Sequence, residues 1–322
     1  MLNNFFDPAI LFFLFGMTAG LLKSNLEIPQ PISKFLSLYL LMALGLKGGF
    51  ALAQSGLTTE VSKGLGAAVF LAVLIPAMGY QLLKRLTDSF NAAAIAATYG
   101  SVSAVTFMTA VQFLDAQSVS YSGHMSAAMA VMESPAILLA VFWVNGIRTQ
   151  TQTSNHANHH SFKQTLHESL TDGAQLLLLG AMVVGILSGD QGKQMMAPFS
   201  VDLFKGMLSF FLLDMGLTAA KNISHLKGKS PLLVAYAIMA PMLHGLIALC
   251  LASALRLSLG DTLLLMVLAA SASYIAVPAA LKLAIPEANP SLYLGLSLGL
   301  TFPLNIILGI PFYFYLAQMA KV

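Results

Sequence analysis

The sequence predicts an all-α polytopic membrane protein whose ten transmembrane helices form two inverted five-helix repeats. The first observation is composition: 57% of the 322 residues are hydrophobic and 9% are charged, whereas soluble domains have about 25% charged residues. The second is a series of apolar runs of about 20 residues, the length that crosses a bilayer. The third is a set of motifs that recurs along the chain at a nearly constant separation.

Ten apolar runs are long enough to be membrane spans, and most connections between them are short and polar. The spans are expected at about 5–22, 32–53, 64–83, 91–113, 122–144, 172–189, 200–220, 231–254, 261–284 and 291–316. The longest connection is rich in Gln, Thr, Ser, Asn and His, which is typical of a linker between two halves. We therefore expect a first repeat at 1–144, a linker at 145–171 and a second repeat at 172–322.

Four pairs of motifs relate the two halves, in the same order and 165–171 residues apart. They are Gly45-Leu46-Lys47-Gly48 with Gly216-Leu217-Thr218-Ala219, Pro76 and Gly79 with Pro241 and Gly245, Ser101-Val102-Ser103 with Ser271-Ala272-Ser273, and Ser134-Pro135 with Phe302-Pro303. Five spans is an odd number, so the second half must enter the membrane upside down. This is the plan of many secondary transporters, whose sites lie near the bilayer midplane between the repeats.

Lysine and arginine are concentrated in the odd-numbered connections, with ten against four in the even-numbered ones. The first group is Lys23, Lys34, Lys84, Arg85, Arg148, Lys163, Lys221, Lys227, Lys229 and Lys282, and the second is Lys63, Lys193, Lys205 and Arg256. Because cytoplasmic loops carry an excess of Lys and Arg, we expect the odd-numbered connections to lie inside. The linker would then be cytoplasmic, and both termini would lie outside.

Two polar stretches fall at equivalent positions in the fourth and ninth spans: Gly100-Ser101-Val102-Ser103 and Ser271-Ala272-Ser273-Tyr274. Serines two residues apart do not share a face of a regular helix, but both can point into one cavity where a helix is broken, as glycine favours. The N-terminus of the following half-helix attracts an anion. We therefore expect broken, crossing helices 4 and 9 to bind an anion with these residues. The alternative is that the small residues only allow close helix packing.

Glu133 lies in the middle of the fifth span, where a charge costs about 2.5–3.5 kcal/mol and usually has a function. Pro135 has no backbone N–H, which leaves the carbonyl group of Val131 available to a cation. The sequence predicts an all-oxygen Na⁺ site formed by Glu133, Ser134 and the tenth-span counterparts Thr301 and Asn305. The alternative is that Glu133 pairs with Lys47 for structural reasons.

Lys47 and Asp214 lie at nearly equivalent positions in the second and seventh spans. Buried charges are costly unless they are paired, so we expect these two residues to form a buried charge pair. Either could instead pair with Glu133, and the pair could be structural or functional.

No motif points to an enzyme: the chain has no phosphate-binding glycine loop, no His-Glu-x-x-His and no serine on a nucleophile turn. Cys250 is the single cysteine, which excludes an intrachain disulfide and a thiolate metal cluster. Without an ATP-binding motif an ion gradient is the natural driver, so we expect Na⁺ as the coupling ion and no cofactor or other metal. The formal net charge of +3 gives no reason to expect a nucleic-acid partner.

Three segments carry a resemblance to a known family: Gly100-Ser101-Val102-Ser103, the run from Ala270 to Ala280, and the run from Pro286 to Pro311. They resemble the cyanobacterial sodium-dependent bicarbonate transporter family, and the resemblance covers essentially the whole chain. It implies a gate domain of spans 1, 2, 6 and 7 and a core domain of spans 3–5 and 8–10. It also implies a homotrimer in a bacterial plasma membrane and regulation by a PII-like protein on the cytoplasmic side.

The expected function is Na⁺-dependent symport of a small inorganic anion, bicarbonate in particular, by alternating access. The resemblance places bicarbonate where the two serine stretches cross, with Na⁺ nearby around Glu133. Two alternatives remain open at this point. One is a cation/proton antiporter that uses Glu133 and Asp214, and the other is a non-transporting membrane sensor that recruits partners at 145–171.

Overall fold

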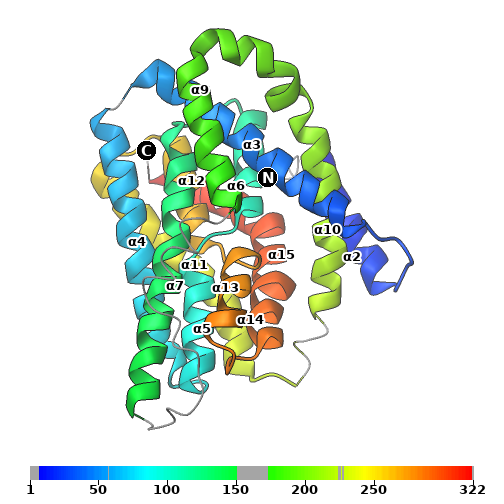
Figure 1. Ribbon diagram of the computed structural model, residues 1–322, viewed down its shortest axis with the longest axis vertical. Coiled ribbons are helices and arrows are strands. Elements are labelled where there is room, and N and C mark those ends of the chain that lie inside the picture. Colours follow the sequence, from blue (N-terminus) through cyan, green and yellow to red (C-terminus); the bar gives the residue numbers. More distant parts are fainter. Residues whose placement is uncertain (1–6, 57, 151–172, 224–225, 227, 321–322) are drawn as a thin grey trace.

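The chain is a multi-pass membrane protein, and the part of it that the structure describes is all-helical. The computed structural model describes residues 7–56, 58–150, 173–223, 226 and 228–320, and every regular element among them is a helix (Figure 1). Seven helical segments in the described residues are long and apolar enough to cross a membrane, and two shorter apolar helices accompany them, Pro8–Leu21 and Leu259–Ala270.

Capping residues explain where several helices of the first half begin. These helices are α2 (Pro8–Leu21), α3 (Gln30–Ser55), α4 (Thr59–Leu83), α5 (Ser89–Gly100), α6 (Ala104–Ala116) and α7 (His124–Gln150). The side chain of Asp7 accepts a hydrogen bond from the N–H of Ala9 at 2.8 Å, and Asp88 accepts bonds from Phe90 and Asn91 at 3.1 and 3.0 Å. These bonds satisfy N–H groups that have no partner within their own helix.

Proline shapes the second half. Its helices are α9 (Gly173–Ala197), η1 (Pro198–Asp202), α10 (Phe204–Ile223), α11 (Pro231–Leu255), α12 (Leu259–Ala270), α13 (Ala276–Ala284), α14 (Pro290–Leu296), η3 (Ser297–Thr301), α15 (Phe302–Leu304), η4 (Asn305–Gly309) and α16 (Ile310–Met319). A π-turn ends two residues before Pro303 and another two residues before Pro311. Because proline cannot donate a backbone hydrogen bond, the helical ladder is disturbed there and widens into π-turns.

The boundaries around the predicted linker differ from expectation. The prediction began the linker at residue 145, but α7 continues to Gln150, because its sequence contains no proline after Pro135 that would end the helix earlier. The rest of the predicted linker, from 151, lies outside the described residues. The prediction ended the next span at 189, but α9 only kinks at Gly189, whose φ of 54° suits glycine, and then continues to Ala197.

Packing divides the helices into two groups. In the four-helix group, α2 packs along α10, α3 packs along α9, and α3 also touches α10. In the larger group, α4 packs against α5 and α7, and α12 packs against α6, α11 and α16. The groups meet where α7 touches α3 and α9, and where α10 touches η3. Figure 1 shows α9, α3, α10 and α2 along one side of the larger group.

The absence of a side chain at Gly100 allows α5 to lie close to α4. A Cβ atom at this position would lie 2.5–2.7 Å from three ring carbons of Pro76. The proline ring is fixed to the backbone of α4, so it cannot rotate away from such a contact. Gly100 therefore sets how closely the last turn of α5 approaches α4.

Arg148 ties the end of α7 to the connection that follows α13. Its guanidinium donates to the two carboxylate oxygens of Glu287 at 3.0 and 2.7 Å, and to the carbonyl oxygen of Ala284 at 3.1 Å. The bidentate geometry is the strong form of this interaction. Burial of the Glu287 carboxyl group raises its pKa, but the hydrogen bonds and charge of Arg148 outweigh burial and hold that pKa below its usual value.

Substitution of Gly100 by alanine should destabilise the protein. The new methyl group must displace the Pro76 ring or move α5, which we expect to cost about 1–3 kcal/mol. The matched control is Gly66→Ala on α4, where a Cβ atom meets nothing within 4 Å; it should be neutral or stabilising by up to about 1 kcal/mol. Thermal unfolding of the purified protein in detergent measures both effects, and equal midpoints for G100A and G66A would contradict the prediction.

The Arg148–Glu287 interaction should make stability depend on pH. Because the pKa of Glu287 is lowered from 4.5 in the folded protein, its contribution is present above about pH 4.5 and is lost as pH falls through the folded-state pKa. The pair is partly exposed, so we expect Glu287→Gln to cost no more than about 1 kcal/mol near pH 7. Thermal unfolding at a series of pH values tests this. In an Arg148→Gln background, E287Q should have no further effect.

Candidate functional site

The chain leaves helical geometry between α5 and α6. α5 ends at Gly100, Ser101 and Ser103 have extended backbone conformations, and α6 begins at Ala104. The Ser103 side chain caps α6 by accepting hydrogen bonds from the Thr106 N–H at 3.2 Å and the Thr106 hydroxyl at 2.9 Å. A short extended segment thus separates two helices whose side chains are almost all buried.

A second interruption lies between α12 and α13. α12 ends at Ala270, and α13 begins at Ala276. The Ser273 hydroxyl accepts a hydrogen bond from the Val277 N–H at 3.3 Å. A serine therefore provides a partner for an N–H group in the first turn of this helix too. Each interruption is therefore followed by a helix N-terminus, with its unpaired N–H groups and partial positive charge.

The two interruptions cross and bind each other. The N–H of Ser103 donates to the Ser271 hydroxyl at 3.0 Å, and the N–H of Ser273 donates to the carbonyl oxygen of Thr98 at 2.8 Å. α6 packs against α12, and α5 packs against α13. The first helix of one segment thus lies beside the second helix of the other, so the two segments run in opposite directions through the crossing.

A cavity of about 140 Å³ lies at the crossing. It is lined by the first residues of both half-helices (Ala104 and Val105 of α6, Ala276 of α13), by the interruptions, and by side chains from α3, α7 and α9. The polar groups on its wall come from Ser37, Ser103, Glu133, Gln175, Ser273 and Tyr274. Among the described residues, no lysine or arginine lines it, so the positive potential that these residues offer to an anion comes from the two helix N-termini.

The structure brings together half of the residues expected to bind the anion. Those that line the cavity are Val102, Ser103, Ser273 and Tyr274, whereas Gly100, Ser101, Ser271 and Ala272 lie behind its wall. Ser271 supports the crossing through its bond with Ser103. The Ser101 hydroxyl is buried and has no hydrogen-bond partner among the described residues.

The residues expected to bind Na⁺ fall into two places. Glu133 lines the cavity, and its carboxylate accepts a hydrogen bond from the Gln175 side chain at 3.0 Å. Ser134 follows on α7 but does not line the cavity. Thr301 bonds the Tyr99 hydroxyl at 2.6 Å and donates to the Ala237 carbonyl oxygen at 2.7 Å.

The Asn305 side chain, like that of Thr301, is hydrogen-bonded to other residues of the protein. Its side chain donates to the carbonyl oxygen of Ala270 at 2.8 Å and accepts from the Tyr313 hydroxyl at 3.2 Å. These bonds hold the last segment against the end of α12. Neither Thr301 nor Asn305 lines the cavity that Glu133 lines.

The expected pairing of Lys47 with Asp214 is wrong. Lys47 forms an ion pair with Asp115 at 3.1 Å and lies over the ring of Phe204, 4.5 Å from its centre. Asp214 instead accepts a hydrogen bond from the Ser33 hydroxyl at 2.5 Å. Equivalence in the repeat does not imply contact: Lys47 pairs with a residue of α6, and Asp214 bonds to a residue in the first turn of α3.

A larger recess of about 1090 Å³ lies next to the cavity. Ser37 and Ile275 line both spaces, and the recess continues between the 27–34 region and α10, past Asp214 and Lys221. These walls include the first and seventh connections, which the distribution of Lys and Arg predicts to be cytoplasmic. The recess therefore borders the cavity on the side that this distribution predicts to be cytoplasmic.

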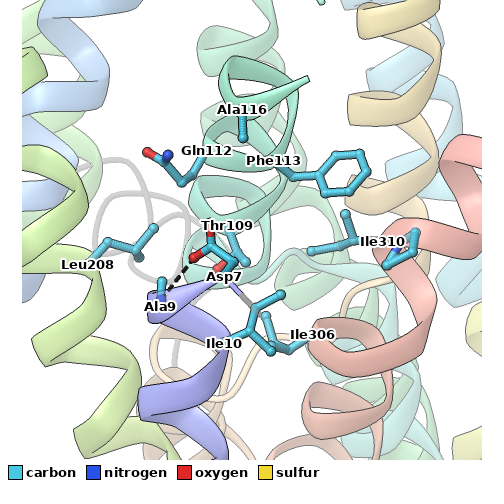
Figure 2. Close-up of a pocket in the computed structure, with 11 residues that line it drawn as sticks. Asp7, Ala9, Ile10, Thr109, Gln112, Phe113, Ala116, Leu208, Ile306 and Ile310 are labelled. Carbon is cyan, nitrogen blue, oxygen red and sulfur yellow. Dashed lines mark hydrogen bonds between the residues drawn. The ribbon is translucent and has the colours of Figure 1, made fainter. Parts of the chain in front are cut away.

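On another side of α6 the two groups of helices close together. A pocket of about 30 Å³ remains there, shown in Figure 2, between α2 and α10 of the four-helix group and α6, η4 and α16 of the larger group. Apolar side chains such as those of Ile10, Phe113 and Ile306 line much of this pocket (Figure 2). Lys205 forms an ion pair with Asp7 at this pocket, at 3.0 Å.

Sequence reasoning missed Gln175 and Ser37. Gln175 is the third residue of α9 and falls inside the span expected at 172–189, where no role was assigned to it, and it is buried against Glu133. Ser37 is a single serine in an apolar run, which is common in membrane helices. Neither carries a signal that separates it from other polar residues; their significance comes from the packing of α3 and α9 beside α7.

Comparison with curated proteins finds no match to the chain. The sequence profile of the Na⁺-dependent bicarbonate transporter superfamily, in contrast, matches residues 8–318. This match covers the helices described above apart from the last residue of α16, and it includes both interruptions and every residue given above as lining the cavity. The chain therefore belongs to the Na⁺-dependent bicarbonate transporter superfamily.

Proposed function

We propose that this protein is a Na⁺-dependent symporter of a small inorganic anion, with bicarbonate as the substrate. The observation that carries the proposal is the cavity at the crossing, where two helix N-termini, two capping serines and one carboxylate meet. Membership of the superfamily supports Na⁺ and bicarbonate as the ions concerned.

Helix termini and hydroxyl groups suit a singly charged anion. Each helix N-terminus contributes about half a positive charge, so two of them balance one negative charge without a basic side chain. The oxygen atoms of Ser103 and Ser273 already accept bonds from their own helices, which leaves their O–H groups to donate to the substrate. Bicarbonate offers several acceptor oxygens to these donors and to the N–H groups of Ala104 and Val105.

Glu133 is the proposed Na⁺ ligand, since it is the one carboxylate among the described residues that line the cavity. Sodium bound there would neutralise a negative charge that otherwise repels the anion. The two ions would thus favour each other's binding, which is the physical basis of obligatory symport. Carboxylate, carbonyl and hydroxyl oxygens are the ligands that hard cations prefer.

Alternating access is proposed from the contrast between the two sides of the cavity. A recess of about 1090 Å³ lies on the side of the basic connections, whereas the pocket that the described residues form between the groups near Asp7 has a volume of about 30 Å³. We interpret this state as open to the cytoplasm. The four-helix group corresponds to the proposed gate domain and the larger group to the proposed core.

The inverted repeat and the assembly belong to the same proposal. The two interrupted segments run in opposite directions, which supports a plan of ten spans in two inverted repeats. The halves of this plan are residues 1–144 and 172–322. We further propose a homotrimer in a bacterial plasma membrane with both termini outside, and a PII-like regulator on the cytoplasmic side. The homotrimer, the bacterial plasma membrane and the PII-like regulator rest on the family resemblance. The outside position of both termini rests on the distribution of Lys and Arg.

Removal of either capping serine at the cavity should abolish most transport. Ser103→Ala and Ser273→Ala each lose a hydroxyl donor to the anion, worth about tenfold or more in binding. The matched control is Ser258→Ala, which removes the cap of α12 and about 1 kcal/mol of stability, but lies away from the cavity. Uptake of labelled bicarbonate into proteoliposomes under a Na⁺ gradient measures the effect. Wild-type uptake by both cavity variants would refute the site.

Neutralisation of Glu133 should weaken the dependence on Na⁺. A neutral amide oxygen binds a cation less strongly than a carboxylate oxygen, so we expect Glu133→Gln to raise the half-saturating Na⁺ concentration about tenfold or more. Glu27→Gln is the control, because Glu27 lines the recess and not the cavity. Uptake of labelled bicarbonate is measured against Na⁺ concentration at constant ionic strength. An unchanged half-saturation for E133Q would place the Na⁺ site elsewhere.

A further inference from the structure

The hydrogen bond between Glu133 and Gln175 joins two parts of the protein across the candidate site. The Gln175 amide donates to a carboxylate oxygen of Glu133 at 3.0 Å, and both side chains line the cavity. Gln175 is 6% exposed, so its amide group has little access to water. A buried amide gains much from a charged acceptor, and a buried carboxylate gains equally from the donor.

This bond also connects the two groups of helices. Glu133 lies on α7, which packs with α4 and α5, and Gln175 lies in the first turn of α9, which packs along α3. The Lys47–Asp115 ion pair makes a second polar connection between the groups, from α3 to the last turn of α6. Movement of one group relative to the other must break or rearrange such connections.

A cation at Glu133 would compete with the Gln175 N–H for the same carboxylate. An amide N–H and a cation both seek the lone pairs of an oxygen atom, and the donor hydrogen is repelled by a positive ion. We infer that Gln175 is a coupling residue whose amide holds Glu133 in the empty protein and is displaced when Na⁺ binds. The inference rests on the proposed function and extends it to a residue of the other helix group.

Displacement of the Gln175 amide would couple Na⁺ binding to the contact between the two groups of helices. When the amide leaves the carboxylate, the direct bond between α7 and α9 is lost at the cavity. Sodium would therefore loosen the contact between the two groups at the place where the substrate sits. Gln175 acts here as a positioning residue and a competitor, and its side-chain carbonyl oxygen is not required as a Na⁺ ligand.

The test is the replacement of Gln175 by methionine, which has similar length and no amide. Removal of the competing donor should lower the Na⁺ concentration for half-maximal thermal stabilisation of purified protein about tenfold, since one hydrogen bond to a charged group is worth about that factor. Sodium chloride replaces choline chloride at constant ionic strength. Half-saturation for Na⁺ in bicarbonate uptake should fall in parallel.

Gln54→Met is the matched control. Gln54 also donates its amide to a carboxylate, that of Asp190 at 2.6 Å, but this pair is exposed and lies within the four-helix group, between α3 and α9. Its removal should leave the Na⁺ dependence unchanged. Gln175→Asn provides a second variant if Q175M does not fold, because the shorter amide no longer spans the distance to Glu133.

The sign of the change decides between three roles of Gln175. A lower half-saturating Na⁺ concentration in Q175M or Q175N supports the inference. A higher one shows that Gln175 is itself a Na⁺ ligand, and an unchanged value with reduced thermal stability shows a purely structural role; either overturns it. If the wild-type protein shows no Na⁺-dependent stabilisation or uptake, both the inference and the proposed function are overturned. If the wild-type protein responds to Na⁺ but the variants have the same half-saturating Na⁺ concentration, the inference alone is overturned.

Discussion

The structure depends on the hydrogen bonds that the two helix interruptions make with each other. An extended segment inside a membrane exposes backbone groups that lipid cannot satisfy, and each unsatisfied group costs several kcal/mol. Here the N–H of Ser103 donates to the hydroxyl oxygen of Ser271, and the N–H of Ser273 donates to the carbonyl oxygen of Thr98. Each interruption is therefore stable only because the other is present. The same arrangement aims two helix N-termini at one cavity, so the bonds that stabilise the fold also create its electrostatic potential.

Around this crossing, contacts of two kinds hold the helices in place. Small residues permit close approach of two helices, as at Gly100 against Pro76. Long polar side chains hold the ends of helices in place, as Arg148 does with Glu287. Both of these examples lie within the larger group. Within the four-helix group, Gly49 against Met182 and Gln54 with Asp190 are contacts of the same two kinds. Each group thus has internal contacts that preserve its shape, which suits a protein whose two groups change position relative to each other.

Much of this organisation could be predicted from the sequence. Apolar length indicated membrane-spanning helices, and the serines at 101, 103, 271 and 273 indicated where helical geometry is interrupted, because serines two residues apart do not share a face of a regular helix. Contacts between distant helices could not be predicted in the same way. Lys47 was assigned to Asp214 by repeat equivalence, yet it meets Asp115, and Gln175 gave no signal at all. Periodicity and composition describe a single helix, whereas these contacts depend on how α3, α7 and α9 pack.

The mutual dependence of the two interruptions has a consequence for biosynthesis. The backbone groups at Ser103 are separated from their partner Ser271 by 168 residues of chain. At about 5–20 residues per second, the first interruption must wait roughly 10–30 s for its partner to be synthesised. During that interval its polar backbone needs another environment, such as water or the insertion machinery, or it must remain temporarily helical. The first half of this protein is thus expected to enter the membrane in a form different from its final one, and to acquire its cavity only when the second half arrives.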